Sequence, residues 1–320
     1  MIHEPIKIFT GNANKPLARE ICEKAKVPLG QMEIIKFSNE NIKVAVKESV
    51  RGADVFVIQP SCTPVNEGII ELLIMIDALK DASAARVTAV CPYFPYVRSD
   101  KKDEPRISIT ARLMADVLHS AGADRVLTMN LHSPQTQGFF RIRCDHLDAG
   151  PILSDYFKNN VKLKNTVVVA PDAGSMKRVI KYARRLELPV AILDKRRTGD
   201  SDSSAKVYHI IGEVKGKNII IFDDEISTAG TMCEVIQTLK KEGARDIRVG
   251  VIHGVLCGPA IQRLRKTQIK ELVVTNTVLI PRKKILKNMT VLSVAEPLAE
   301  AISRIHNNES IGEIFKHTLK

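Results

Sequence analysis

The chain has 320 residues, of which 44% are hydrophobic and 26% charged, and it carries a formal net charge of +12. Its length allows two domains with sizeable cores, whereas its longest apolar cluster, residues 69–76, is interrupted by Glu71 and is too short to cross a membrane. The basic residues are spread over many segments and are not interleaved with aromatic ones, which favours small polyphosphate substrates over nucleic acid, with plain solubility as the alternative.

Apolar strands alternate with helices along the first half of the chain. We expect strands at residues 6–10, 34–37, 55–59, 86–90 and 125–129, and helices at about residues 15–26, 66–80 and 110–121. After Phe140 the pattern becomes irregular, and we place a domain boundary near residues 145–151.

The second half repeats this alternation, with expected strands at residues 166–170, 190–193, 219–222, 248–252, 271–275 and 290–293 and a last helix at about 297–306. Strands that alternate with helices form parallel sheets covered on both faces. The sequence therefore predicts an α/β fold of two similar doubly wound parallel-sheet domains and suggests an internal duplication. We expect the domains at residues 1–147 and 148–296, with the C-terminal helix in 297–320 as a candidate to rejoin the first.

One strand–loop–helix unit has the features of an anion site. The strand 219–222 is followed by the acids Asp223 and Asp224, the small-residue loop Ser227–Gly230 and a helix that ends at Gly243. Unpaired N–H groups and the helix dipole attract an anion to such a loop, but two adjacent carboxylates would repel it unless they bind sugar hydroxyls or hydrated Mg²⁺. A sugar phosphate satisfies both ends. The alternative is an ordinary turn whose acids cap the helix dipole.

This unit resembles the ribose-5-phosphate loop of type I phosphoribosyltransferases, in which two acids precede a Thr-x-Gly-Thr turn. Ordered motifs over nearly the whole chain are similar to those of ribose-phosphate pyrophosphokinases, among them Lys36-Phe37-Ser38-Asn39, Phe94-Pro95-Tyr96, Gln137-Gly138-Phe139-Phe140 and Pro171-Asp172-Ala173-Gly174. The resemblance implies transfer of pyrophosphate from MgATP to the 1-hydroxyl of ribose 5-phosphate, which gives 5-phosphoribosyl 1-diphosphate (PRPP) and AMP for nucleotide biosynthesis.

The resemblance also implies roles for individual residues. Lys195 and Arg197 match the two bases that engage the phosphates, and the polar segment 198–206 after them has the composition of a mobile lid. A solvated basic turn is the simpler reading of Lys195-Arg196-Arg197. The residues matched to the ribose 5-phosphate site are Asp223, Asp224, Ser227, Thr228, Ala229, Gly230 and Thr231.

His132 and Asp172 match the family's metal-contacting pair, with Mg²⁺ as the implied cofactor. His132 also belongs to the implied ATP site, together with the adenine-side residues Phe37 and Asn39 and with Arg98 and Asp100. Simpler readings are a satisfied loop histidine for His132, a helix N-cap for Asp172 and plain core for Phe37.

The chain departs from the family pattern at four of its site positions. Asn41 replaces a usual Glu, Ser99 a usual Gln, Asn130 a usual Asp and Ser227 the third Asp of the loop. The substituted side chains still form hydrogen bonds, so we expect adjusted contacts rather than a lost site.

Regulation and assembly are also implied. Family enzymes commonly form hexamers with an inter-subunit site at which phosphate activates and ADP inhibits. Ser49, Arg51 and Ser310 match positions of that site, whereas Gly312 stands where a Ser is often found.

Two other functions remain open: a non-catalytic associated subunit of such an assembly, and a nucleobase phosphoribosyltransferase that consumes PRPP. The retained Thr228–Thr231 turn and basic pair disfavour the first, and the adenine motif in the first half disfavours the second. The N-terminus lacks a signal pattern and the six cysteines lack CxxC spacing, so we expect a cytoplasmic protein with reduced thiols.

Overall fold

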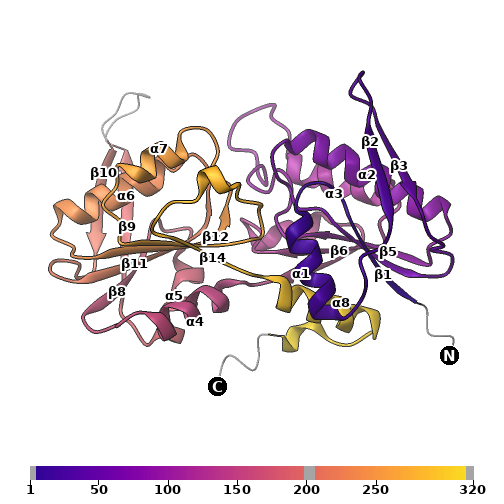
Figure 1. The fold of residues 1–320 in the computed structure, drawn as a ribbon. Helices are drawn as coiled ribbons and strands as arrows, with labels where there is room; N and C mark the ends of the chain where they lie inside the picture. Colours follow the sequence, from indigo (N-terminus) through magenta and orange to yellow (C-terminus); the bar gives the residue numbers. More distant parts are fainter. Residues whose placement is uncertain (1–4, 198–205, 315–320) are drawn as a thin grey trace.

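The computed structural model describes residues 5–197 and 206–314, and Figure 1 shows two β-sheets side by side, each flanked by helices. The first sheet consists of parallel strands in the order β1 (Ile6–Thr10), β4 (Asp54–Ile58), β5 (Arg86–Cys91), β6 (Arg125–Met129) and β7 (Arg143–Leu147). Its strand β4 is buried along its whole length, as expected of a parallel sheet covered on both faces.

Both faces of the first sheet are covered, but one of the covering helices comes from the far end of the chain. Helices α2 (Val65–Asp81) and α3 (Thr110–Ser120) pack on one face. On the other face, α1 (Lys15–Ala25) lies against α8 (Ala295–His306). We therefore propose that α8 belongs with residues 1–147 and that residues 148–296 form the other domain.

The contact that holds the end of α8 is made by a fully buried carboxylate in β4. Arg86 donates to Asp54 Oδ2 at 2.5 Å and to the carbonyl oxygen of Ile305 at 2.9 Å. His306 Nδ1 lies 2.9 Å from the same Asp54 oxygen. Because a buried charge needs such partners, the C-terminal helix and the first sheet stabilise one another.

The second sheet is longer and reverses its strand order in the middle. Its order is β10 (Lys206–Ile211), β9 (Val190–Arg197), β8 (Thr166–Ala170), β11 (Asn218–Ile226), β12 (Ile247–Gly254), β13 (Glu271–Thr275) and β14 (Met289–Leu292), and among these only β10 is antiparallel to its neighbour. The order reverses between β8 and β11, and ligand sites of open α/β sheets lie at the carboxyl ends of strands near such a point.

The helices of the second domain divide between its two faces. Helices α4 (Gly150–Asn160) and α5 (Met176–Leu186) share a core cluster with Ile220 and Phe222 of β11. Helices α6 (Gly230–Lys241) and α7 (Ala260–Arg265) pack on the other face with Ile219 and Ile221. The first of these cores continues into the first domain, so the two sheets share one apolar interior.

The structure corrects three details of the sequence prediction. Strand β11 continues to Ile226 instead of ending at residue 222, because Asp223 and Glu225 stay paired with β12. The segment after Phe140 is not irregular but contains β7 and the start of α4. An unpredicted strand, β3 (Ile42–Val46), pairs with β2 (Met32–Lys36). The hairpin that they form projects from the first domain (Figure 1).

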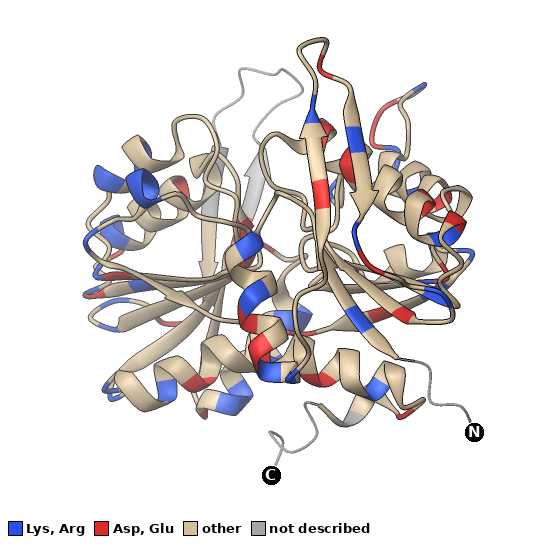
Figure 2. Cartoon of the chain, turned by 45° about the vertical axis from the view of Figure 1, so that its right-hand side comes forward, with Lys and Arg blue, Asp and Glu red and all other residues tan. Residues whose placement is uncertain are grey.

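Charged residues of both signs are interspersed over the helices of both domains (Figure 2). None of the helices within residues 5–197 and 206–314 is long and apolar enough to cross a membrane. The lid expected at 198–206 falls almost wholly on residues 198–205, which lie outside the described residues.

Candidate active site

The acidic end of β11 meets a histidine from the other domain. His132 follows β6 of the first sheet, and its Nδ1 lies 2.6 Å from Oδ2 of Asp224 in the second sheet. Asp224 is 4% exposed, whereas the His132 side chain is 42% exposed. The carboxyl ends of β6 and β11 therefore meet at the domain junction, and the imidazole reaches solvent there.

A partly buried arginine that the sequence analysis did not single out completes this contact. Arg178 of α5 places Nη2 at 3.1 Å from Asp224 Oδ1 and at 3.8 Å from Asp223 Oδ1. Burial alone would raise the pKa of Asp224, but the His132 hydrogen bond and the Arg178 charge outweigh it and hold this pKa below its usual range. Burial and the charge of Asp224 raise the pKa of Asp223. Of the two groups, Asp224 therefore takes the anionic form more readily.

The predicted ATP-site residues after β5 reach the same junction. Arg98 Nη1 lies 3.4 Å from Glu225 Oε1, and Tyr93 donates its hydroxyl to Glu225 Oε2 at 3.0 Å. The hydrogen bond to Asp224 raises the pKa of His132 against the effect of burial, and the charge of Asp100 adds to this rise. The structure thus brings Arg98 and His132 together around the end of β11.

The loop after β11 has the geometry of an anion cradle. Ala229, the residue before α6, has φ of 60°, and its side chain does not cap the helix. The first N–H groups of α6 have no intrahelical acceptors, so they are available to an anion, and the helix dipole favours its charge. Arg263 of α7 donates to the Thr228 carbonyl oxygen at 3.1 Å and fixes the outer side of the loop.

Ser227 makes a contact that the amino-acid sequence did not suggest. Its Oγ lies 3.1 Å from Cys257 Sγ, and its carbonyl oxygen accepts from the Cys257 N–H at 3.0 Å. The side chain therefore joins the loop after β11 to the loop after β12.

Because backbone N–H groups and the helix dipole do not depend on the side chain at position 227, we expect Ser227→Asp to change kcat/KM for ribose 5-phosphate by less than about tenfold, roughly 1.4 kcal/mol. Steady-state kinetics of Ser227→Asp beside Ser227→Ala measures this. An unsubstituted protein that is inactive until Ser227→Asp restores turnover would contradict the expectation and would indicate a synthetase that has lost its chemistry.

Asp172 is exposed in the loop before α5. Its Oδ1 accepts from the Ser175 N–H at 2.7 Å, and its carbonyl oxygen accepts from the Ser175 hydroxyl at 2.8 Å. Its simpler reading as the N-cap of α5 is wrong, because Ser175 holds that position. Asp172 Oδ2 has no hydrogen-bond partner among residues 5–197 and 206–314. No group of three or more metal-ligating side chains occurs in the described part of the chain.

The basic pair lies in the second domain, and the adenine motif lies in the hairpin that projects from the first domain (Figure 1). Lys195 and Arg197 lie in β9 opposite Tyr208 and Lys206 of β10, and their side chains lie outside the described residues. Phe37, with 49% of its surface exposed, and Asn39 lie in the turn between β2 and β3, where Asn39 Oδ1 accepts from the Asn41 N–H at 3.2 Å. Phe37 is therefore not core, which removes its simpler reading.

The residues matched to an effector site are exposed at one end of the first sheet. Ser49 and Arg51 precede β4, and Ser310 follows α8, whose end is held at the start of β4 by His306 and Asp54. Ser310 Oγ accepts from the Gly312 N–H at 3.3 Å.

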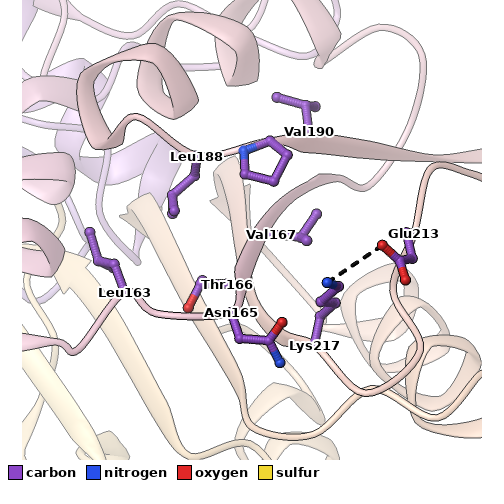
Figure 3. A pocket seen from close by; sticks show the side chains of 9 residues that line it. Leu163, Asn165, Thr166, Val167, Leu188, Val190, Glu213 and Lys217 are labelled. Atoms are coloured by element: carbon purple, nitrogen blue, oxygen red, sulfur yellow. Dashed lines mark ion pairs between the residues drawn. The ribbon is translucent and has the colours of Figure 1, made fainter.

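A separate cavity of about 310 Å³ lies at the opposite end of the second sheet (Figure 3). It is lined where β8 and β9 begin, by Thr166, Val190, Leu163 and the ion pair of Lys217 and Glu213. Because ligand sites of such sheets lie at the carboxyl ends of the strands, we do not include this cavity in the candidate site.

The site combines an acidic strand end, a helix N-terminus open to an anion and a histidine from the first domain. These features define an α/β protein whose site suits a phosphorylated sugar or nucleotide. The chain is 49% identical over 315 residues to the ribose-phosphate pyrophosphokinase of Deinococcus radiodurans, covering 97% of this chain and 98% of that protein. It is 50% identical over 312 residues to the enzyme of that name from Clostridium acetobutylicum, covering 97% of each. The chain belongs to the ribose-phosphate pyrophosphokinase family.

Two further comparisons agree. Residues 6–122 match the N-terminal domain of ribose phosphate pyrophosphokinase, and residues 203–316 match the phosphoribosyl synthetase-associated domain. The solved structure of phosphoribosylpyrophosphate synthetase from Mycobacterium smegmatis superposes with a TM-score of 0.90 at 40% identity, covering 95% of this chain and all of that one. The predicted fold class is thereby confirmed.

Proposed function

We propose that this chain transfers the diphosphate group of ATP to the 1-hydroxyl of ribose 5-phosphate, giving PRPP and AMP for nucleotide biosynthesis. The observation that carries the proposal is the 2.6 Å contact of His132 with Asp224, because it joins the first domain to the strand end that precedes the anion cradle. A site shared by two domains suits a reaction between two phosphorylated substrates, since each domain then holds one.

In this proposal the residues act by positioning and by charge. The N–H groups at the start of α6 hold the 5-phosphate, and the carboxylates of Asp223 and Asp224 accept hydrogen bonds from ribose hydroxyls. Lys195 and Arg197 neutralise charge on the transferred phosphates, which is the main catalytic need in such transfers. Phe37, Asn39, Arg98 and Asp100 hold ATP.

The donors at the junction fit a Mg²⁺ that keeps most of its waters. Asp172 offers a carboxylate oxygen that has no partner in the described part of the chain. The exposed His132 is suited to contact through water, since imidazole is a poor direct ligand for this ion. When bound, Mg²⁺ would neutralise and orient the ATP phosphates. Asp224 is already engaged by His132 and Arg178, so we assign it to the sugar rather than to the metal.

We propose further that the protein is cytoplasmic and assembles as a hexamer, with phosphate as activator and ADP as inhibitor at a site that includes Ser49, Arg51 and Ser310. A Cβ added at Gly312 would lie 3.5 Å from Ser310 Oγ, so a serine fits there without a clash. We expect Gly312→Ser to lower the phosphate concentration needed for half-activation, because it adds a hydroxyl donor. Phosphate titrations of the two proteins compare this directly, and equal half-activating concentrations would contradict it.

The proposed function is tested by AMP formation from ATP and ribose 5-phosphate with Mg²⁺ and phosphate. We expect AMP and PRPP in equal amounts and no AMP when ribose 5-phosphate is omitted. An associated subunit would give neither product alone but would change the activity of an added synthetase. A nucleobase phosphoribosyltransferase would consume PRPP when a free base is supplied.

A further inference from the structure

Three hydrogen-bond donors converge on one carboxylate oxygen just below the candidate site. Asp148 follows β7, and its Oδ1 accepts from Asn130 Nδ2 at 2.9 Å, from the Gly150 N–H at 2.9 Å and from the Tyr182 hydroxyl at 3.0 Å. These donors come from the first domain, from the start of α4 and from α5. One side chain therefore connects three segments of the fold.

The first of these segments carries His132. Asn130 lies two residues before it, is 5% exposed and has φ of 42°, so the chain turns sharply there. Asn130 Oδ1 accepts from the Ala149 N–H at 2.7 Å, and its carbonyl oxygen lies 3.2 Å from His253 Nε2. The turn that presents His132 is thus fixed on residues 148–149 through both polar atoms of the Asn130 amide.

Another segment carries the arginine that holds Asp224. Tyr182 lies one helical turn after Arg178 on α5, so the two side chains share a face of the helix. Tyr182 is 2% exposed and packs so closely on Gly150 that a Cβ there would lie 1.8 Å from its ring. This packing leaves no room for α5 to shift relative to Asp148, and it therefore fixes where Arg178 meets Asp224.

We propose that Asp148 is a positioning residue for the transfer reaction, which sets His132 through Asn130 and Asp224 through Tyr182 and Arg178. The inference rests on the proposed function. It also gives a physical reason for the amide at position 130, because an amide donates to Asp148, whereas a second carboxylate would repel it.

The pair can be tested by exchanging its two side chains. Asn130→Asp alone replaces the 2.9 Å hydrogen bond between the two side chains by two carboxylates that face each other. The double variant Asn130→Asp/Asp148→Asn restores one carboxylate and one amide between these positions. The amide introduced at position 148 can turn its nitrogen toward the carboxylate introduced at position 130. The Gly150 N–H and the Tyr182 hydroxyl then lose Oδ1 as their acceptor, so we expect the rescue to be partial.

We expect Asn130→Asp to lower kcat by about a hundredfold, as misplacement of a catalytic group by roughly 1 Å does, with KM for both substrates within about threefold. The double variant should recover at least about tenfold of this loss, a coupling that independent sites would not show. A single variant with kcat within about threefold of the unsubstituted protein, or a double variant no better than the single one, overturns the inference. An unsubstituted protein without turnover would instead contradict the proposed function.

A tyrosine pair keeps the test decisive if Asn130→Asp does not fold. Tyr156 donates its hydroxyl to Glu271 Oε1 at 2.5 Å, just as Tyr182 donates to Asp148. Glu271 begins β13, at the end of the second sheet that faces away from the candidate site. We expect Tyr182→Phe to lower kcat by about tenfold and Tyr156→Phe by less than about twofold, as loss of one hydrogen bond to a charged group allows. Equal kcat for the two variants, at equal melting temperatures, would show a merely structural role for Asp148.

Discussion

Replacing Asp224 by alanine is expected to lower kcat/KM for ribose 5-phosphate by about a hundredfold or more. Its carboxylate contacts His132 through one oxygen and Arg178 through the other, and each oxygen keeps a lone pair for a sugar hydroxyl. The substitution therefore leaves a partly buried guanidinium without its closest anion, frees His132 to rotate and leaves ribose hydroxyls without acceptors, each a loss of about 1–3 kcal/mol.

Steady-state kinetics and thermal unfolding of Asp224→Ala separate these losses. Asp246→Ala is a suitable control, because Asp246 pairs with Lys270 at the surface of the same domain and exposed pairs contribute little. We expect the control to keep its kcat/KM within about twofold. A folded Asp224→Ala protein with nearly unchanged kcat/KM would contradict the role given to the acidic pair.

Lys195→Ala is expected to reduce kcat far more than it weakens ribose 5-phosphate binding. A cation that acts on the transferred phosphates stabilises the transition state most, so its loss should cost at least ~3 kcal/mol, or over a hundredfold in kcat. Single-turnover and steady-state rates, measured at saturating ribose 5-phosphate, give the kcat term directly.

Arg196→Ala is the matched control for this variant. Positions 195 and 197 alternate with 196 along β9, and alternate positions of a strand lie on the same face. We therefore expect Arg197→Ala to resemble Lys195→Ala, and Arg196→Ala to keep most of the turnover. Equal losses in all three variants would indicate general electrostatics rather than an assigned pair, and a Lys195→Ala protein with most of its turnover would rule out the role.

Periodicity and local chemistry were enough to predict the fold class and the strand–loop–helix unit of β11 and α6. Strands such as β4 and β8 are continuous β-branched and apolar runs, because both faces of their sheets are buried. The loop Ser227–Gly230 is recognisable because small residues between a buried strand and a helix suit the close approach of an anion. These features depend on residues close together in the chain.

The parts that depend on distant residues were not predictable from the sequence alone. Arg178 lies among five basic residues of α5, and nothing in the pattern distinguishes the one that meets Asp224. The end of β11 was placed too early because acids disfavour strands, whereas pairing with β12 overrides that preference. Glu225, directly after the predicted pair, was the one overlooked residue with a local signal.

Transfer of labelled phosphate from ATP tests the central claim most directly. The protein would be incubated with ribose 5-phosphate and Mg²⁺, with ATP labelled in either the α- or the β-phosphate, and the sugar and nucleotide products would be separated. Diphosphate transfer predicts that the β-label appears in the sugar product and that the α-label remains in AMP. A β-label that remains in the nucleotide, or no labelled sugar product at all, would contradict the account.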